Sequence, residues 1–166
     1  MNSDLALIVA SQLGAMLAVL GLVTIVVWVM LIIAHWKMFT KAGEAGWKSL
    51  IPIYSDYTLF KITWNTKWFW IYMGAIFVSG ILTSMNQPYA LQADGNLVLV
   101  GEPNMLLDFL RIIVSFGVMI IYVVLAAKTS MAFGKGVAFT FGMVLLPNIF
   151  AMILAFGSAT YRGPQD

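Results

Sequence analysis

Few residues of this 166-residue chain could carry out chemistry, and they lie far apart in the sequence. There is one histidine, His35, and no cysteine, so thiol chemistry is excluded and no cluster has the spacing of a metal site. Lys128 and Ser130 could form a base and a nucleophile, but catalysis also needs a third group that orients them. The neighbouring sequence offers no such group. We therefore predict a non-enzymatic protein without catalytic, cofactor-binding or metal-binding residues.

Two further polar features have simpler explanations than catalysis. The segment Phe133-Gly134-Lys135-Gly136 is rich in glycine but lacks the Walker pattern and a carboxylate for magnesium. We interpret it as a tight turn between two antiparallel helices. His35 precedes Trp36 and Lys37 at the end of a long apolar segment, so we expect a solvated polar side chain at a membrane interface.

The charged pair Asp108 and Arg111 is the most interesting ionisable pair. The two residues are three positions apart and therefore lie on one face of a helix. Both fall near the start of an apolar segment, where long side chains can reach the headgroup layer. We interpret them as an interfacial ion pair. The alternative is that Asp108 and Arg111 line an ion path or contact a partner.

The elements that must position these residues are strongly apolar. Apolar residues make up 61% of the chain and charged residues 10%, against roughly 45–50% and about 25% in soluble domains. The segment Leu5–Trp36 contains no charged residue, and as a helix it would be about 48 Å long, more than the roughly 30 Å of a bilayer core. We read it as a retained helix, since it lacks the basic start of a signal peptide. The sequence predicts one all-α integral membrane domain, 1–166, with four transmembrane helices at about 5–36, 68–85, 106–127 and 137–158.

Loop charges predict the orientation. All seven lysines fall in the segments 37–67 and 128–136, on one side of the four predicted spans. By the positive-inside rule this side is the cytoplasm, which places both termini outside. The net charge of +2 is too small to suggest nucleic acid as a partner.

Two of the connecting segments have a pattern of their own. In 49–64 the apolar residues follow a helical spacing of three and four, which predicts an amphipathic helix on the inner leaflet or against the bundle. Its apolar stripe comprises Leu50, Ile53, Tyr54, Tyr57 and Phe60. In 86–105 the dipeptide Asp94-Gly95 is flanked by apolar runs and predicts a small extracytoplasmic hairpin-like loop.

Small residues repeat every four positions in the first and last predicted spans. Such ridges let membrane helices approach each other closely, either within one chain or between chains. They are formed by Ala10, Gly14 and Ala18 and by Ala151, Ala155 and Ala159. The last span also contains Pro147, which removes one backbone hydrogen bond and predicts a kink.

Two runs of sequence carry a family resemblance. The first, 36–54, contains Lys41-Ala42-Gly43 followed by Gly46-Trp47 and Leu50-Ile51-Pro52 before Tyr54. The second contains Phe133-Gly134-Lys135-Gly136, Leu145-Leu146-Pro147, Leu154-Ala155-Phe156-Gly157 and Tyr161-Arg162-Gly163-Pro164. Together they resemble a bacterial membrane-domain family of unknown function that also occurs as the N-terminal membrane region of some type I signal peptidases. The resemblance implies a bacterial inner-membrane protein and no activity. The chain departs from that family at Ser55-Asp56, where asparagine is usual, and in its long 86–105 connection.

Two functions fit these observations. The first is a scaffold or accessory subunit that lies in the lipid bilayer and binds other membrane proteins or a second copy of itself. The second is a small transporter or channel that forms on oligomerisation. The predicted spans carry no charge near their middle, which favours the first function.

Overall fold

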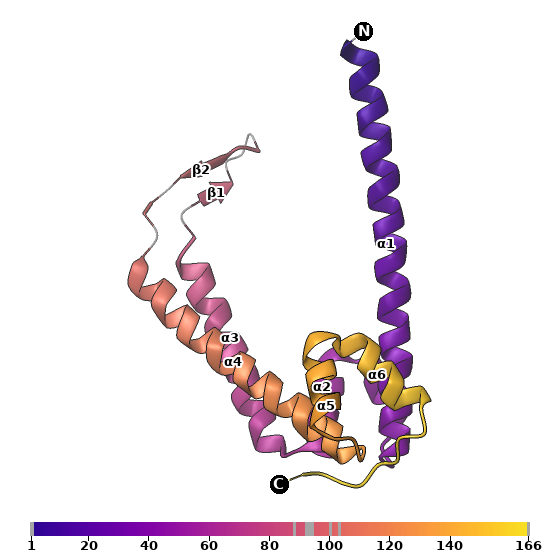
Figure 1. The fold of residues 1–166 in the computed structure, drawn as a ribbon. Coiled ribbons are helices and arrows are strands. Elements are labelled where there is room, and N and C mark those ends of the chain that lie inside the picture. Colours follow the sequence, from indigo (N-terminus) through magenta and orange to yellow (C-terminus); the bar gives the residue numbers. More distant parts are fainter. Residues whose placement is uncertain (1, 88, 92–94, 100, 103, 166) are drawn as a thin grey trace.

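The computed structural model describes residues 2–87, 89–91, 95–99, 101–102 and 104–165 (Figure 1). Three of its helices are long and apolar enough to cross a membrane, which makes the chain a multi-pass membrane protein by length and composition. They are α1 (Asn2–Lys41), α3 (Thr66–Met85) and α4 (Met105–Ala132). Two of these helices, α3 and α4, pack against each other as an antiparallel pair, and α1 lies apart from both (Figure 1).

Between α1 and α3 the chain forms the 3-10 helix η1 (Gly46–Leu50) and the helix α2 (Pro52–Thr63). The chain can reverse after α1 because Gly43 adopts a positive φ of 78°, which disfavours residues with a side chain. Pro52 occupies the first turn of α2, where its missing N–H breaks no hydrogen bond. The predicted helix 49–64 corresponds to α2, which begins at Pro52, whereas residues 49 and 50 belong to η1.

The protein-facing side of α2 includes only part of the apolar stripe that the sequence predicts, since Tyr54 and Tyr57 are half-buried. Of that stripe, Phe60 is buried, but Leu50 and Ile53 are exposed. The polar residues Thr58 and Thr63 are buried instead. Their hydroxyls donate to the carbonyl oxygens four residues earlier, at 2.7 Å in both cases, so burial leaves these hydroxyls paired.

Two short strands connect α3 to α4. β1 (Tyr89–Leu91) and β2 (Leu97–Leu99) pair antiparallel, with Ala90 opposite Val98. This is the segment for which the sequence predicts a hairpin-like loop. Gly95 has a positive φ of 85°, as a tight turn requires. Asp94, the other residue of the predicted turn, lies outside the described residues.

The predicted fourth span, 137–158, is two helices instead of one. These are α5 (Val137–Leu145), of nine residues, and α6 (Pro147–Phe156), of ten, and a spanning helix needs about 20. Pro147 has no N–H, and its ring disfavours a helical conformation at Leu146, which has φ −135° and ψ 62°. The sequence therefore located the defect correctly, but its effect is a reversal of the chain and not a kink.

The reversal is tight because α5 and α6 touch at a glycine. A side-chain carbon on Gly142 would come within 2.0 Å of the Phe150 ring. The ring can therefore pack against α5 only while position 142 has no side chain. On the other side, the Phe150 ring meets Phe139 edge-on at 4.8 Å between ring centroids.

The C-terminal segment returns to the end of the molecule that carries the lysines. The backbone N–H of Arg162 donates to the carbonyl oxygen of Ala132 at 2.7 Å, and that of Gln165 donates to Thr63 at 3.0 Å. The two termini consequently lie at opposite ends of α1 (Figure 1). The structure therefore confirms three helices of spanning length and not the predicted fourth, because α5 and α6 bring the chain back. The side of the membrane on which each terminus lies stays a prediction.

Lys41 joins the end of α1 to the end of α6. Its ammonium group donates to the carbonyl oxygens of Leu154 at 2.7 Å and Gly157 at 2.9 Å. The last carbonyl groups of a helix have no partner within the helix, and a cation stabilises them. Lys37 adds a second contact, 4.3 Å above the Phe156 ring. These contacts dock α6 against α1 beside the buried residues Ala34, Met38 and Leu154.

We predict that Lys41→Met destabilises the protein because it leaves two carbonyl groups at the end of α6 without their charged donor. The expected loss is about 1.5–3 kcal/mol, the usual range for hydrogen bonds to a charged group. Thermal unfolding in a mild detergent, followed by circular dichroism, measures it. Lys67→Met is the control, since Lys67 is exposed and its side chain has no partner among the described residues. Equal melting temperatures for the two variants would contradict the role of Lys41.

Candidate functional site

All six α-helices contribute to one cavity of about 290 Å³, which we call the junction cavity. Most of its lining is apolar, with Leu31, Leu125 and Met143 among the residues that form it. Its polar lining comprises His35, Asp56, Tyr72, Tyr122, Thr129 and Asn148. A mostly apolar cavity with a few converging polar groups is the usual form of a small-molecule site.

Each polar residue reaches the junction cavity for a local structural reason. His35 lies near the end of α1, where its ring stacks on Phe39 with 6.0 Å between ring centroids. Tyr122 and Thr129 are seven residues apart on α4 and so share one face of that helix. Asn148 lines the cavity because it lies in the first turn of α6, directly after the break at Pro147. The reversal of the chain thus helps to build the cavity.

A second, smaller cavity of about 170 Å³ adjoins the first, and we call it the side cavity. His35 and Asp56 line both cavities, and Ser49 lines the side cavity. The Ser49 side chain is buried, and within the described structure its Oγ is the one buried side-chain oxygen or nitrogen without a hydrogen-bond partner. An unpaired hydroxyl of this kind costs free energy, roughly 1–3 kcal/mol.

Ser49, His35 and Asp56 are the residue types of a catalytic triad. In such a triad hydrogen bonds link the serine to the histidine and the histidine to the carboxylate. Here the Ser49 hydroxyl has no partner, and no hydrogen bond joins His35 to Asp56 in the described part of the chain. The three side chains share a cavity but are not arranged as a nucleophile with its base.

Asp56 carries the only formal negative charge that lines either cavity. Although the residue is exposed, the surrounding protein partly desolvates it, and this burial raises the pKa of its carboxyl above the ordinary value. Among the described residues it forms no ion pair and no hydrogen bond through its side chain. The same residues bring no three His, Asp or Glu side chains together that could hold a metal ion.

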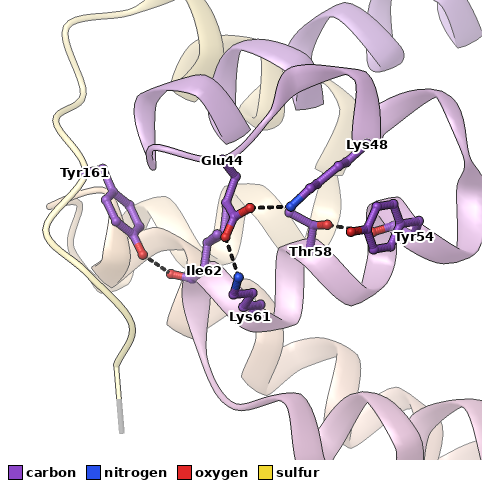
Figure 2. Close-up of polar contacts among 7 residues, drawn as sticks. All are labelled: Glu44, Lys48, Tyr54, Thr58, Lys61, Ile62 and Tyr161. Carbon is purple, nitrogen blue, oxygen red and sulfur yellow. Dashed lines mark hydrogen bonds and ion pairs between the residues drawn. The ribbon is translucent and has the colours of Figure 1, made fainter.

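Two lysines at this end of the molecule form ion pairs with Glu44, which follows α1. Glu44 forms ion pairs with Lys48 of η1 and with Lys61 of α2, the latter at 2.7 Å (Figure 2). The hydrogen bonds from Lys48 and Lys61 hold the pKa of the Glu44 carboxyl below its ordinary value. One carboxylate thereby ties η1 to α2 and fixes the helix that carries Asp56.

The C-terminal segment closes this end of the molecule over α2. Tyr161 donates its hydroxyl hydrogen bond to the carbonyl oxygen of Ile62 at 2.7 Å (Figure 2). Its ring packs on Phe133, and Arg162 lies against Gly134, where a side-chain carbon would come within 2.6 Å of the Arg162 Nε. Gly134 also has a positive φ of 68°, so the turn requires glycine on two grounds.

The residues proposed from the sequence lie elsewhere. Asp108 and Arg111 form an exposed ion pair at 3.3 Å near the start of α4, at the far end of that helix from the junction cavity. Ala151 and Ala155 are buried where α6 packs on α1, and Ala159 is buried in the segment after α6. Ala10, Gly14 and Ala18 are exposed on α1. The second ridge of small residues is therefore buried, whereas the first is exposed.

Sequence reasoning missed the junction cavity. His35 was expected to be a solvated side chain, but it is half-buried and lines both cavities. One signal was present in the sequence: Ser55 and Thr58 form a polar side on α2, and in a membrane protein a polar side tends to face the protein interior.

Comparison with known proteins gives a partial match. Residues 96–164 match the model of a family of unknown function (DUF5684). The matched range includes α4, α5 and α6 but not α1 or α2, so it contains Tyr122, Thr129 and Asn148 of the junction cavity and excludes His35 and Asp56. No curated protein and no solved structure matches the chain.

We predict that Glu44 makes stability dependent on pH. Because its pKa is lowered in the folded state, its contribution is present above the unfolded pKa of about 4.3 and is lost as the pH falls through the folded value. Glu44→Gln should lower the melting temperature at pH 7, and the difference from the parent protein should shrink below about pH 4. Asp108→Asn, which opens an exposed ion pair, is the control and should change little at either pH. A difference that is independent of pH would refute this account.

Proposed function

We propose that this protein is a non-catalytic scaffold or accessory subunit of a membrane complex, and that α1 is its binding element. The observation that supports this proposal is the exposure of α1. From Ile8 to Met30 its side chains are exposed, except for a half-buried Val27. In the described structure α1 contacts η1, α2 and α6 near its C-terminal end and contacts neither α3 nor α4.

The exposed part of α1 has a face suited to helix contacts. Ala10, Gly14, Ala18 and Gly21 fall within about 80° of one another around the helix axis, at 100° per residue. A side-chain carbon added at Gly14 or Gly21 would touch nothing within 4 Å. Small residues on one face let two helices approach closely and gain van der Waals contacts. The chain does not use this face for packing within itself, because the structure leaves the face open.

The distribution of charge supports an orientation in a bacterial inner membrane. Arg162 lies beside the lysine-bearing turn at Gly134, so seven lysines and this arginine gather at one end of the molecule. Arg111 is the one basic residue at the other end. By the positive-inside rule the lysine end is cytoplasmic, which puts the N-terminus outside and residue 165 inside.

A second function, a small transporter, has its own support. Transporter sites often lie where a broken helix meets a polar cavity. The junction cavity has this form, since the break between α5 and α6 supplies Pro147 and Asn148 to its lining. A purified protein that moves a small solute across liposomes without a partner would favour this function over the scaffold.

We predict that Gly14→Leu prevents association without unfolding the protein. The new side chain meets no atom of the same chain, so stability should stay within about 0.5 kcal/mol, whereas a close helix contact would be blocked. Crosslinking in membranes followed by native purification measures association, and circular dichroism measures folding.

The matched control is Ala15→Leu. Ala15 is also exposed on α1, but it lies about 100° around the helix axis from Gly14 and about 60° beyond the edge of the small-residue face. This variant should associate as the parent protein does. Equal association of Gly14→Leu and Ala15→Leu would show that the small-residue face is not the binding surface.

The orientation gives a separate prediction. Because the chain has no cysteine, each single-cysteine variant reports one position. Ser3→Cys should react with an impermeant thiol reagent in intact cells, and Gln165→Cys and Lys67→Cys should react only after the membrane is opened. Labelling of Gln165→Cys in intact cells would restore the four-span arrangement.

A further inference from the structure

The junction cavity holds several polar side chains that make no side-chain hydrogen bond with the described protein. They are His35, Asp56, Tyr72, Tyr122 and Asn148. The remaining polar lining residue, Thr129, donates to a backbone carbonyl oxygen, as do Thr58, Thr63 and Ser130 elsewhere at the same end. Polar groups that surround a cavity without pairing with one another are available to a ligand.

The charge of the cavity specifies the kind of ligand. Among the described residues that line it, Asp56 is the one acidic residue, and none is a lysine or an arginine. Three lysines at this end of the molecule are engaged elsewhere, since Lys48 and Lys61 bind Glu44, and Lys41 binds the end of α6. A partly desolvated carboxylate that has no cation as a partner is unfavourable, and a bound cation offsets that cost.

The remaining lining specifies an organic cation and not a metal ion. Calcium takes six to eight oxygen ligands, and magnesium six, but this cavity offers a single carboxylate. The rings of Phe60, Tyr72 and Tyr122 line the cavity with Asp56, and aromatic rings attract ammonium groups. Leu31, Leu125 and Met143 add an apolar surface. The volume of about 290 Å³ is at the lower end for small-molecule sites.

We propose that the junction cavity binds a ligand that joins a protonated amine to an apolar body, with the ammonium group on Asp56 between Tyr72 and Tyr122. The apolar body lies against Leu31, Leu125 and Met143. Ser49 supports the same location, because its buried hydroxyl is unpaired and the residue lines the adjoining side cavity together with His35 and Asp56. This site is separate from the proposed association through α1.

The test uses the full chain in nanodiscs made of phosphatidylcholine and phosphatidylglycerol, which carry no primary amine. Phenethylammonium is the probe, and 2-phenylethanol is its uncharged counterpart. Calorimetric titration should give saturable binding of phenethylammonium, and 2-phenylethanol should bind at least about tenfold more weakly because it cannot pair with Asp56. Equal binding of both compounds, or no saturable binding at millimolar concentration, overturns the proposal.

Variants locate the binding site. Asp56→Asn keeps the shape of the side chain and removes its charge, and should weaken phenethylammonium binding by at least about thirtyfold. Asp108→Asn removes a charge far from the cavity, and Gly14→Leu changes the association surface, so both should bind as the parent protein does. If Asp56→Asn does not fold, Ala126→Phe, which fills the cavity from α4, takes its place and should abolish binding. Unchanged binding in a folded cavity variant overturns the proposal.

A last arm identifies the source of the amine. Adding phosphatidylethanolamine to the nanodiscs presents the same ammonium group on a lipid. Displacement of the probe by this lipid indicates that the site takes a lipid headgroup, whereas unchanged probe binding indicates a free small amine. Phosphatidylglycerol, added in the same amount, is the control and should not displace the probe.

Discussion

The arrangement of this protein depends on a helix that is interrupted before it can cross a membrane. Pro147 cannot donate a backbone hydrogen bond, so α5 stops at Leu145 and α6 leaves in a new direction. Each piece is about half the length of a span, and each has end groups that need partners in a medium with little water. At the end of α6 the ammonium group of Lys41 is the partner of two such carbonyl groups. This contact brings the C-terminal segment to the end of the molecule that carries the lysines.

Polar contacts hold together the lysine-bearing end of the molecule. Glu44 joins η1 to α2 through two lysines, and the hydroxyl of Tyr161 joins the C-terminal segment to Ile62. Lipid chains offer no hydrogen-bond partners, so polar groups are more favourable inside the protein than on its surface. The same rule leaves apolar residues such as Ile53 on the outside. The junction cavity is the place in this arrangement where polar groups face one another without pairing.

The sequence predicts the long helices well because a membrane span depends on the length and apolar composition of one continuous segment. The segment that became α1 has no charge for thirty-two residues, and the turn at Gly134 follows from its glycines. What could not be predicted depends on contacts between distant segments. Nothing around Pro147 distinguishes a kink from a reversal, since the outcome depends on Lys41, more than a hundred residues earlier. The cavity was missed for the same reason, because His35 and Asn148 meet only after the reversal.

The return of the C-terminal segment also sets an order of assembly. Tyr161 and Arg162 follow every helix along the chain, so a ribosome makes them after α1 to α6 are complete. Their hydrogen bonds to Ile62 and Ala132 can therefore form only after residues 161 and 162 have been made and have left the ribosome. The contacts that close the lysine-bearing end are thus among the last that the described chain can form.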